Sequence, residues 1–267
     1  MQNIRSPAVA GMFYPAEADI LARDVRAMLA AAKPCEYSPK ALIVPHAGYV
    51  YSGPIAASAY AALKNAAARI RRVVLLGPTH RVAVRGLALP GADTFTTPLG
   101  AVRVDVEAAQ AIAHLPQVTV SPQAHALEHS LEVQLPFLQA VLRDFKLLPL
   151  AVGMATPEEV AEVLELLWGG EETLIVISSD LSHYLPYDVA KRVDSATVQS
   201  ILELKHPISH EQACGGTPIN GLLVAARHHR LAPHLLDLRN SGDTAGPRDG
   251  VVGYASFVFT EDVEHVG

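Results

Sequence analysis

Three histidines in this chain each follow a run of strand-forming residues: His46 follows residues 41–45, His80 follows 73–77 and His183 follows 174–177. In an open α/β sheet, the carboxyl ends of the strands form the crevice that binds ligands. Histidine is the side chain best suited to bind a transition metal or to move protons near neutral pH. The repeated pattern therefore predicts one composite site assembled from distant segments.

The segment that leads into His183 is unusually polar for the end of a buried strand. Ser178-Ser179-Asp180 precedes it, and such a run is poorly explained by packing. Asp180 would ligate a metal or accept a hydrogen bond from a histidine ring. It would equally serve as a helix N-cap, so its role stays open at this stage.

A fourth histidine, His129, stands between Glu128 and Ser130 at the expected start of a helix over residues 130–142. Ser130 would cap that helix, and His129 would either project into the crevice or face solvent. The Glu-His pair lacks the spacing of a zinc-protease helix, which excludes the metalloprotease interpretation.

Two residues compete for a further place at the site. Asp243 lies in a turn between two C-terminal strands, and two histidines with one carboxylate suit Fe(II). A carboxylate in such a position is otherwise an ordinary turn residue. Cys214 is the competing soft ligand, although a free cysteine is more often a small buried apolar residue.

The elements that must position these residues alternate between strands and helices along the chain. Continuous apolar strands with amphipathic helices between them indicate an α/β fold, with a central mixed, mostly parallel sheet covered by helices on both faces. No linker or repeat interrupts residues 1–267, so we expect a single domain. The expected strands include 41–45, 73–77, 86–89, 146–152, 173–177, 235–239 and 251–259, and the expected helices include 17–32, 55–68, 106–113, 157–167, 188–204 and 221–229.

The bulk composition excludes several function classes. A formal charge of −6 and the lack of a basic cluster argue against nucleic acid as a partner. No apolar run reaches membrane-spanning length, the N-terminus lacks a signal-peptide core, and two cysteines cannot form a disulfide framework. We therefore expect a cytoplasmic protein. Nucleotide-binding glycine motifs and a Gly-x-Ser-x-Gly elbow are also absent from the sequence.

Several motifs in order make the chain similar to one known family. These are residues 6–15 (SPAVAGMFYP), 45–53 (PHAGYVYSG), 77–80 (GPTH), 128–136 (EHSLEVQLP), 178–183 (SSDLSH) and 252–255 (VGYA). Together they resemble the Memo family over essentially the whole chain. Its bacterial and archaeal members are often named protein B of the AmmeMemoRadiSam system, after neighbouring AMMECR1-like and radical-SAM proteins.

The resemblance implies a fold like that of class III extradiol dioxygenases, which are non-haem Fe(II) enzymes. It implies that His46 and His80 bind the metal, that His183 is the acid/base and that His129 lines the same cleft. The third ligand is a glutamate in the dioxygenases and a cysteine in some Memo proteins. This C-terminal loop offers Asp243 or Thr244 there, and we expect Asp243 because threonine is a poor metal ligand.

Two functions follow as hypotheses. The first is an Fe(II)-dependent, dioxygenase-like oxidoreductase with metal ligands His46, His80 and Asp243 and with His183 and His129 as catalytic residues; Zn or Cu are the alternative metals. The second is a non-catalytic module that uses the same cleft to bind a small molecule, a peptide, a metal or an AMMECR1-like or radical-SAM partner protein.

Overall fold

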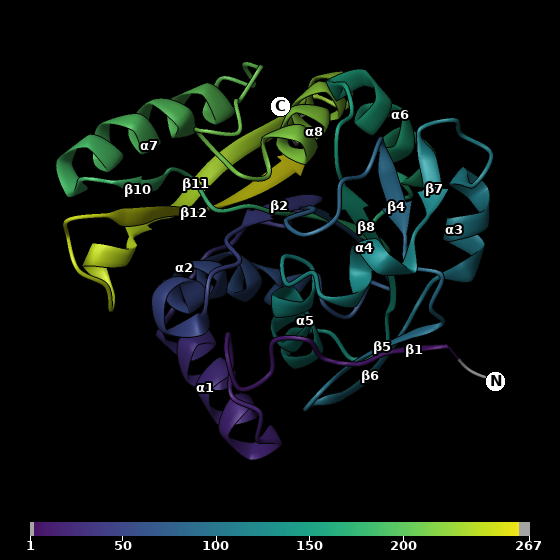
Figure 1. The fold of residues 1–267 in the computed structure, drawn as a ribbon, viewed down its shortest axis with the longest axis horizontal. Helices are drawn as coiled ribbons and strands as arrows, with labels where there is room; N and C mark the ends of the chain where they lie inside the picture. The colour runs from purple at the N-terminus through teal and green to yellow at the C-terminus, as the bar shows by residue number, and fades with distance from the viewer. Residues whose placement is uncertain (1–2, 262–267) are drawn as a thin grey trace, which may run out of the picture.

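A central sheet of nine strands organises the protein (Figure 1). The structure is a computed structural model and describes residues 3–261. Across the sheet the strands run in the order β10 (His183–Leu185), β12 (Val251–Glu261), β2 (Ala41–Val44), β9 (Thr173–Ser178), β3 (Arg72–Pro78), β8 (Lys146–Val152), β4 (Leu87–Leu89) and β7 (Val118–Val120), and β11 (Leu231–Asn240) also pairs with β12.

The middle of the sheet is parallel and its flanks are antiparallel. Strands β2, β9, β3 and β8 pair in parallel, so their carboxyl ends lie at one edge. On one side β12 runs antiparallel to β2, and on the other β4 runs antiparallel to β8. The expected mixed sheet is therefore confirmed, with its parallel part confined to the centre and the β4–β7 pair.

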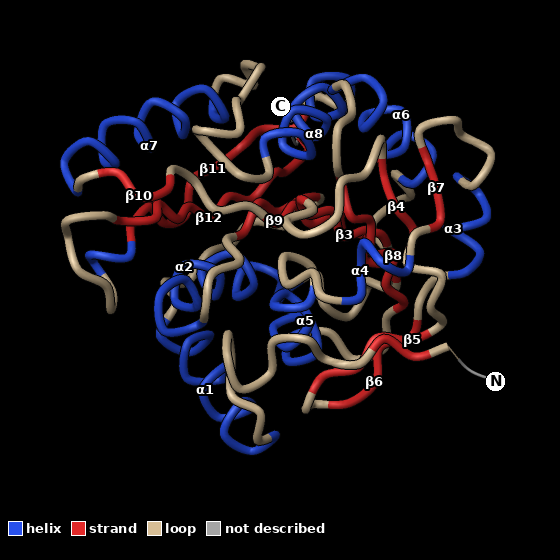
Figure 2. Tube along the Cα trace, in the orientation of Figure 1, coloured by secondary structure: helices blue, strands red, loops and turns tan. Residues whose placement is uncertain are grey.

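Helices cover both faces of the sheet, as Figure 2 shows. One face packs against α1 (Ala18–Ala31), α2 (Tyr49–Ala61) and α5 (Leu135–Val141). The other packs against α3 (Val106–Ile112), α6 (Pro157–Leu167), α7 (Tyr187–Leu202) and α8 (Gly216–His228). Among residues 3–261, no helix is long and apolar enough to cross a membrane.

Because helices cover both faces of the sheet, the central strands are continuous apolar runs. In β2, Leu42 and Val44 enter one hydrophobic cluster, while Ala41 and Ile43 enter the other. Successive side chains of a strand point to opposite faces, so a strand covered on both sides must be apolar at every position. The same alternation places Val176 of β9 on the first face and Ile177 on the second.

A smaller three-stranded sheet consists of β1 (Ile4–Arg5), β5 (Thr94–Thr97) and β6 (Gly100–Arg103). The sequence predicted only its turn at residues 97–100. Its strands are too short to give a clear alternating pattern, because they contain two to four residues each. The remaining short helices are α4 (Pro122–Ala126) and the 3₁₀ turns η1 (Ala62–Asn65), η2 (Glu132–Gln134) and η3 (Ser241–Asp243).

Glu132 ties the N-terminal segment to the body of the protein. This carboxylate is fully buried and forms an ion pair with Arg5. It also accepts hydrogen bonds from the hydroxyl of Tyr14 and from the backbone N–H groups of Ala8 and Val9. The segment is thereby held against the loop that carries His129, and Phe13 packs against the imidazole of His129 at 4.7 Å between ring centroids.

Candidate metal centre

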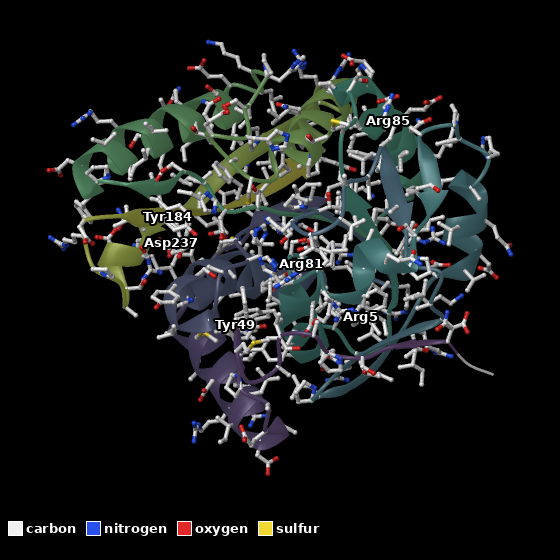
Figure 3. The ribbon with its side chains drawn as sticks, in the orientation of Figure 1. Arg5, Tyr49, Arg81, Arg85, Tyr184 and Asp237 are labelled. Carbon is white, nitrogen blue, oxygen red and sulfur yellow. The ribbon has the colours of Figure 1, made fainter. Side chains whose placement is uncertain are left out.

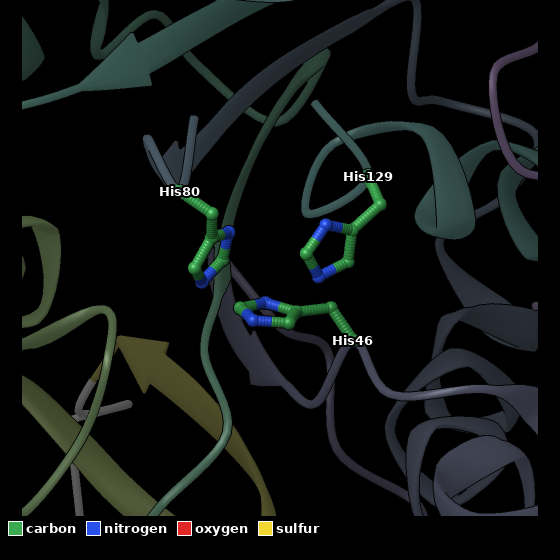
Figure 4. Close-up of side chains that lie close together, drawn as sticks. All are labelled: His46, His80 and His129. Atoms are coloured by element: carbon green, nitrogen blue, oxygen red, sulfur yellow. The ribbon is translucent and has the colours of Figure 1, made fainter. Parts of the chain in front are cut away.

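Three histidine side chains meet at the carboxyl edge of the parallel strands. His46, His80 and His129 each offer a ring nitrogen, and these three atoms lie within 4.8 Å of one another. Figure 4 shows the three rings facing a common space. His46 is 2% exposed, whereas the side chains of His129 and His80 are 18% and 30% exposed. The cluster therefore opens to solvent on the side of His80.

Neighbouring strands and one close backbone approach bring these residues together. His46 follows β2 by two residues and His80 follows β3 by two residues, while β9 lies between those strands. His129 comes from the loop before η2, which packs against the end of β3. A Cβ on Gly77 would lie 2.8 Å from Ser130 Oγ and 3.2 Å from Ser130 Cβ, so glycine at this position leaves room for the approach. Ser130 Oγ then donates a hydrogen bond to the carbonyl of Pro78 at 2.9 Å.

Ser130 therefore bridges to β3 instead of capping a helix. The sequence suggested a helix beginning at this serine, but the chain first forms η2, and α5 begins at Leu135. The hydroxyl of Ser130 is not available as a cap, because it donates to the carbonyl of Pro78 at the end of β3. The helix that the sequence predicted is correspondingly shorter at its start.

A hydrogen-bond network fixes which nitrogen of His46 carries its proton. Ser178 Oγ donates its single proton to the carbonyl of Ser130 at 2.6 Å and accepts from Gln134 Nε2 at 2.8 Å. His46 Nδ1 lies 2.9 Å from the same oxygen, and it must therefore act as the donor. The lone pair of the ring is consequently on Nε2, which is the atom left to bind a metal.

The amide of Gln134 is itself oriented by two partners. Its oxygen accepts a hydrogen bond from the hydroxyl of Tyr60 at 2.9 Å, and its nitrogen donates to the carbonyl of Pro45 at 2.9 Å. Since the amide cannot flip without losing both bonds, it presents its N–H to Ser178. Gln134 thus fixes the proton of His46 on Nδ1 indirectly, through Ser178.

Glu128 orients His80 in an analogous way. Its Oε1 lies 2.9 Å from His80 Nδ1, and its Oε2 accepts the backbone N–H of His80 at 2.6 Å. Burial raises the pKa of Glu128, but the hydrogen bonds from His80 and Ser130 outweigh this and hold the pKa at about 2. The ionised carboxylate accepts the Nδ1 proton, which leaves Nε2 of His80 with its lone pair. A carboxylate behind a histidine is a common arrangement around metal ligands.

Burial favours the neutral forms of His46 and His129. Burial lowers the pKa of His46 well below its ordinary value, and the neighbouring His129 and His80 lower it further. Burial also lowers the pKa of His129 to about 4. Neutral imidazole is the form that binds transition metals. Three convergent imidazoles, two of them with an Nδ1 atom held by a partner, therefore fit a divalent transition-metal ion.

His183 and Asp180 lie beside the cluster but outside the three-histidine group. His183 begins β10 and is half-buried, and its charge interacts with those of His46 and His80. Burial lowers its pKa, so it is available as a neutral base. Asp180 accepts the backbone N–H of His46 at 2.7 Å, and burial raises its pKa to about 7. It supports the backbone of His46, and it does not cap a helix.

The structure does not bring Asp243 into this group. Its carboxylate is exposed, accepts the N–H of Asn240 at 3.0 Å within η3 and accepts the hydroxyl of Tyr187 at 2.5 Å. Thr244 likewise bonds locally, to the carbonyl of Ser241. The third member of the cluster is therefore His129, whereas the predicted third ligand was Asp243. Asp243 lies outside the cluster, where its carboxylate accepts a hydrogen bond from the backbone of its own turn.

The alternative soft ligand, Cys214, does reach the cluster. Its Sγ lies 3.3 Å from Nε2 of His46, and burial raises the pKa of the thiol to about 12. A Cβ on Gly215 would lie 2.6 Å from the Cβ of Ser179, so glycine allows this loop to approach the end of β9. The protonated thiol lies at the nitrogen that would bind the metal.

Sequence reasoning missed the residues that orient the histidines. Glu128, Gln134 and Ser178 all stand in motifs that the sequence singled out, but nothing in their spacing pairs them with a particular ring. The polar run after β9 was the one available signal, because a buried strand end that carries serine and aspartate must satisfy those groups with partners.

Replacing Ser178 with alanine should weaken metal binding by about 10–100-fold, the usual cost of losing an outer-shell partner of a metal ligand. The variant frees Nδ1 of His46, so the proton is no longer confined to that atom. Competition with a chromophoric chelator measures the affinity. Ser256→Ala is the matched control, because Ser256 is buried and its hydroxyl has no partner among the described residues. Equal affinities for both variants would contradict the role of Ser178.

The family model and the similar curated proteins point to the same family. A family model described as Memo-like protein matches residues 5–258. A MEMO1 family protein of Methanosarcina barkeri is 37% identical over 272 residues, covering 96% of this chain and 99% of that protein. A MEMO1 family protein of Aquifex aeolicus is 36% identical over 270 residues, with the same coverage of 96% and 99%.

Among solved structures, the chain is similar in fold to an uncharacterized protein of Escherichia coli. The TM-score is 0.52 at 14% sequence identity, and the match covers 81% of this chain and 98% of the other. At this identity the likeness concerns the fold alone. It agrees with the mixed α/β sheet described above.

Proposed function

The chain belongs to the Memo family, and from this premise we propose that it is a metal-dependent, dioxygenase-like oxidoreductase. In this proposal, His46, His80 and His129 hold one divalent transition-metal ion, with Fe(II) as the working metal and Zn or Cu as competitors for the same nitrogens. The observation that supports it most directly is the convergence of three ring nitrogens within 4.8 Å at the carboxyl ends of parallel strands.

The donor set differs from the two histidines and one carboxylate that are typical of Fe(II) oxygenases. Here the third position is a neutral imidazole, and the thiol of Cys214 lies 3.3 Å from His46 Nε2. When bound, the metal would supply a positively charged centre with open positions for a substrate oxygen and a second small molecule. Cys214 is the residue of this chain that can add a soft ligand, in exchange for its thiol proton.

The surrounding side chains supply proton transfer and orientation. His183 is neutral and half-buried beside the cluster, so it can take the proton of a bound hydroxyl group and return it later. Its lowered pKa keeps it free to accept a proton at neutral pH. Glu128, Ser178 and Gln134 hold His80 and His46 in place, so the ligands need little reorganisation when the metal binds.

The test combines metal analysis with oxygen consumption. Protein purified without oxygen is expected to hold one iron per chain and, when iron-loaded, to consume oxygen with at least one member of a panel of vicinal diols. His183→Ala should keep its metal and lose about 10²–10⁴-fold in rate, the usual contribution of a general acid–base.

Two results would contradict this proposal at different points. If the iron-loaded protein consumes no oxygen across the panel, or if His183→Ala matches the wild type, the oxidoreductase role is wrong and the metal site stands. If the protein retains no transition metal, the metal site is wrong as well. The cleft would then be a binding module, and retention of an AMMECR1-like or radical-SAM protein in a pull-down would support that second function.

A further inference from the structure

Arg81 is an exposed arginine close to the three-histidine cluster. It directly follows His80, the most exposed member of the cluster, and its own side chain is exposed. Figure 3 places it near the centre of the molecule in that view, whereas Arg85, four residues later, lies at the outer edge by α6. Its positive charge is close enough to His129 to lower the pKa of that imidazole.

Among the described residues, each carboxylate beside the cluster already has another hydrogen-bonding or ion-pair partner. Glu128 bonds to His80, Asp180 bonds to the backbone of His46, and Glu132 pairs with Arg5. Among the residues that the structure describes, Arg81 has no carboxylate within ion-pair distance and no hydrogen-bond partner. Arg85, in contrast, pairs with Glu159 at 2.6 Å.

The charge around a filled site would therefore be positive on the side from which a ligand enters. A divalent ion held by three imidazoles keeps its full charge, and a Cys214 thiolate as a fourth ligand would still leave one positive charge. The guanidinium of Arg81 adds a further positive charge at the opening. A planar guanidinium matches the two oxygens of a carboxylate and binds them with two parallel hydrogen bonds.

One aromatic side chain, Phe13, lies directly beside His129. Phe13 is partly exposed and packs on His129 at 4.7 Å between ring centroids, so it can contact a flat ligand beside that histidine. Half-exposed aromatic side chains near a polar site provide contact area for an aromatic ring.

We propose that the natural ligand of this site is an aromatic carboxylate, whose carboxylate group pairs with Arg81 while its ring lies against Phe13. This inference rests on the proposed metal site, because the positive charges of the ion and of Arg81 would act together on the carboxylate. Arg81 is then a residue that selects the ligand by its charge, and it makes no contribution to holding the metal.

The test measures binding of benzoate to the Zn(II)-loaded protein by titration calorimetry. Zn(II) is chosen because it has no redox chemistry. Benzoate should bind Arg81→Gln about 10–100-fold more weakly than wild type, as expected for the loss of a charged hydrogen-bonding partner. Arg81→Lys should give an intermediate affinity, since lysine keeps the charge and lacks the planar fork.

Two controls make the result specific. Arg85→Gln removes a neighbouring exposed arginine and should leave benzoate affinity unchanged. Benzamide has the same shape as benzoate but no charge, and its weaker binding should not respond to Arg81→Gln. Equal benzoate affinity for wild type and Arg81→Gln, or an equal loss in Arg85→Gln, would overturn the inference.

The zinc content of each sample separates this proposal from the metal site. Arg81→Gln and wild type should retain the same zinc, because Arg81 does not ligate the ion. If zinc is retained and the benzoate affinity of Arg81→Gln equals that of the wild type, the proposed ligand class is wrong and the metal site stands. If the wild type retains no zinc, the metal site is wrong. Titration of the metal-free chain then decides the role of Arg81 alone, since a loss of benzoate affinity in Arg81→Gln would still support it.

Discussion

Replacing His46 with alanine should lower the metal affinity of the chain by at least about 100-fold, more than the usual cost of disturbing an outer-shell partner. His46 is the buried member of the cluster, and its ring is the one whose tautomer is fixed by Ser178 and Gln134. Its loss leaves two nitrogen donors, both on the solvent side. Metal content per chain and chelator competition measure the effect, and circular dichroism verifies that the variant is folded.

Two further variants make the His46 result specific. His234→Ala removes a histidine that stacks on Tyr37 with 4.2 Å between ring centroids, away from the cluster, and should leave metal affinity unchanged. Asp243→Ala should also leave metal affinity unchanged, since that carboxylate bonds to Asn240 and Tyr187. A normal affinity in His46→Ala, or a large loss in Asp243→Ala, would show that the metal binds elsewhere or through the C-terminal turn.

Replacing Glu132 with alanine lowers the free energy of unfolding by about 3–5 kcal/mol, the cost of leaving a buried charge without its partner. Arg5 would keep its charge at 7% exposure, and the N–H groups of Ala8 and Val9 would lose their acceptor. Urea denaturation measures the change as a shift in midpoint at constant slope.

A surface ion pair provides the comparison for Glu132. Glu171 pairs with Arg69, and their side chains are 78% and 46% exposed. Glu171→Ala should therefore cost less than about 1 kcal/mol. The predicted contrast between the two variants is the essential result. If Glu132→Ala costs as little as Glu171→Ala, the buried ion pair does not anchor the N-terminal segment.

Most of the sheet and the helices could be predicted from the sequence because their patterns are strong. Strand β9 is apolar at consecutive positions, and α6 begins at Pro157 behind the N-cap Thr156. The sequence could not reveal that β9 lies between β2 and β3, since apolar runs carry no information on strand order. The smaller sheet was missed because its strands are short.

The site could be predicted only in part, for a related reason. A histidine after an apolar strand identifies His46 and His80, because parallel strand ends share an edge of the sheet. His129 was predicted to line the cleft, but its place in the three-histidine cluster depends on how the loop 128–131 packs on Gly77. Asp243 was favoured by chemistry alone, and no pattern in the sequence shows that its carboxylate caps its own turn.

The position of β9 between β2 and β3 has a consequence for biosynthesis. A ribosome releases the chain from its N-terminus, so His46, His80 and His129 all emerge before β9 exists. Until β9 inserts, the two strands that carry His46 and His80 have no common neighbour to hold them at the right spacing, and Ser178 is not there to orient His46. A growing chain therefore carries all three histidines before the proposed site exists, and any metal would bind there only after the sheet is complete.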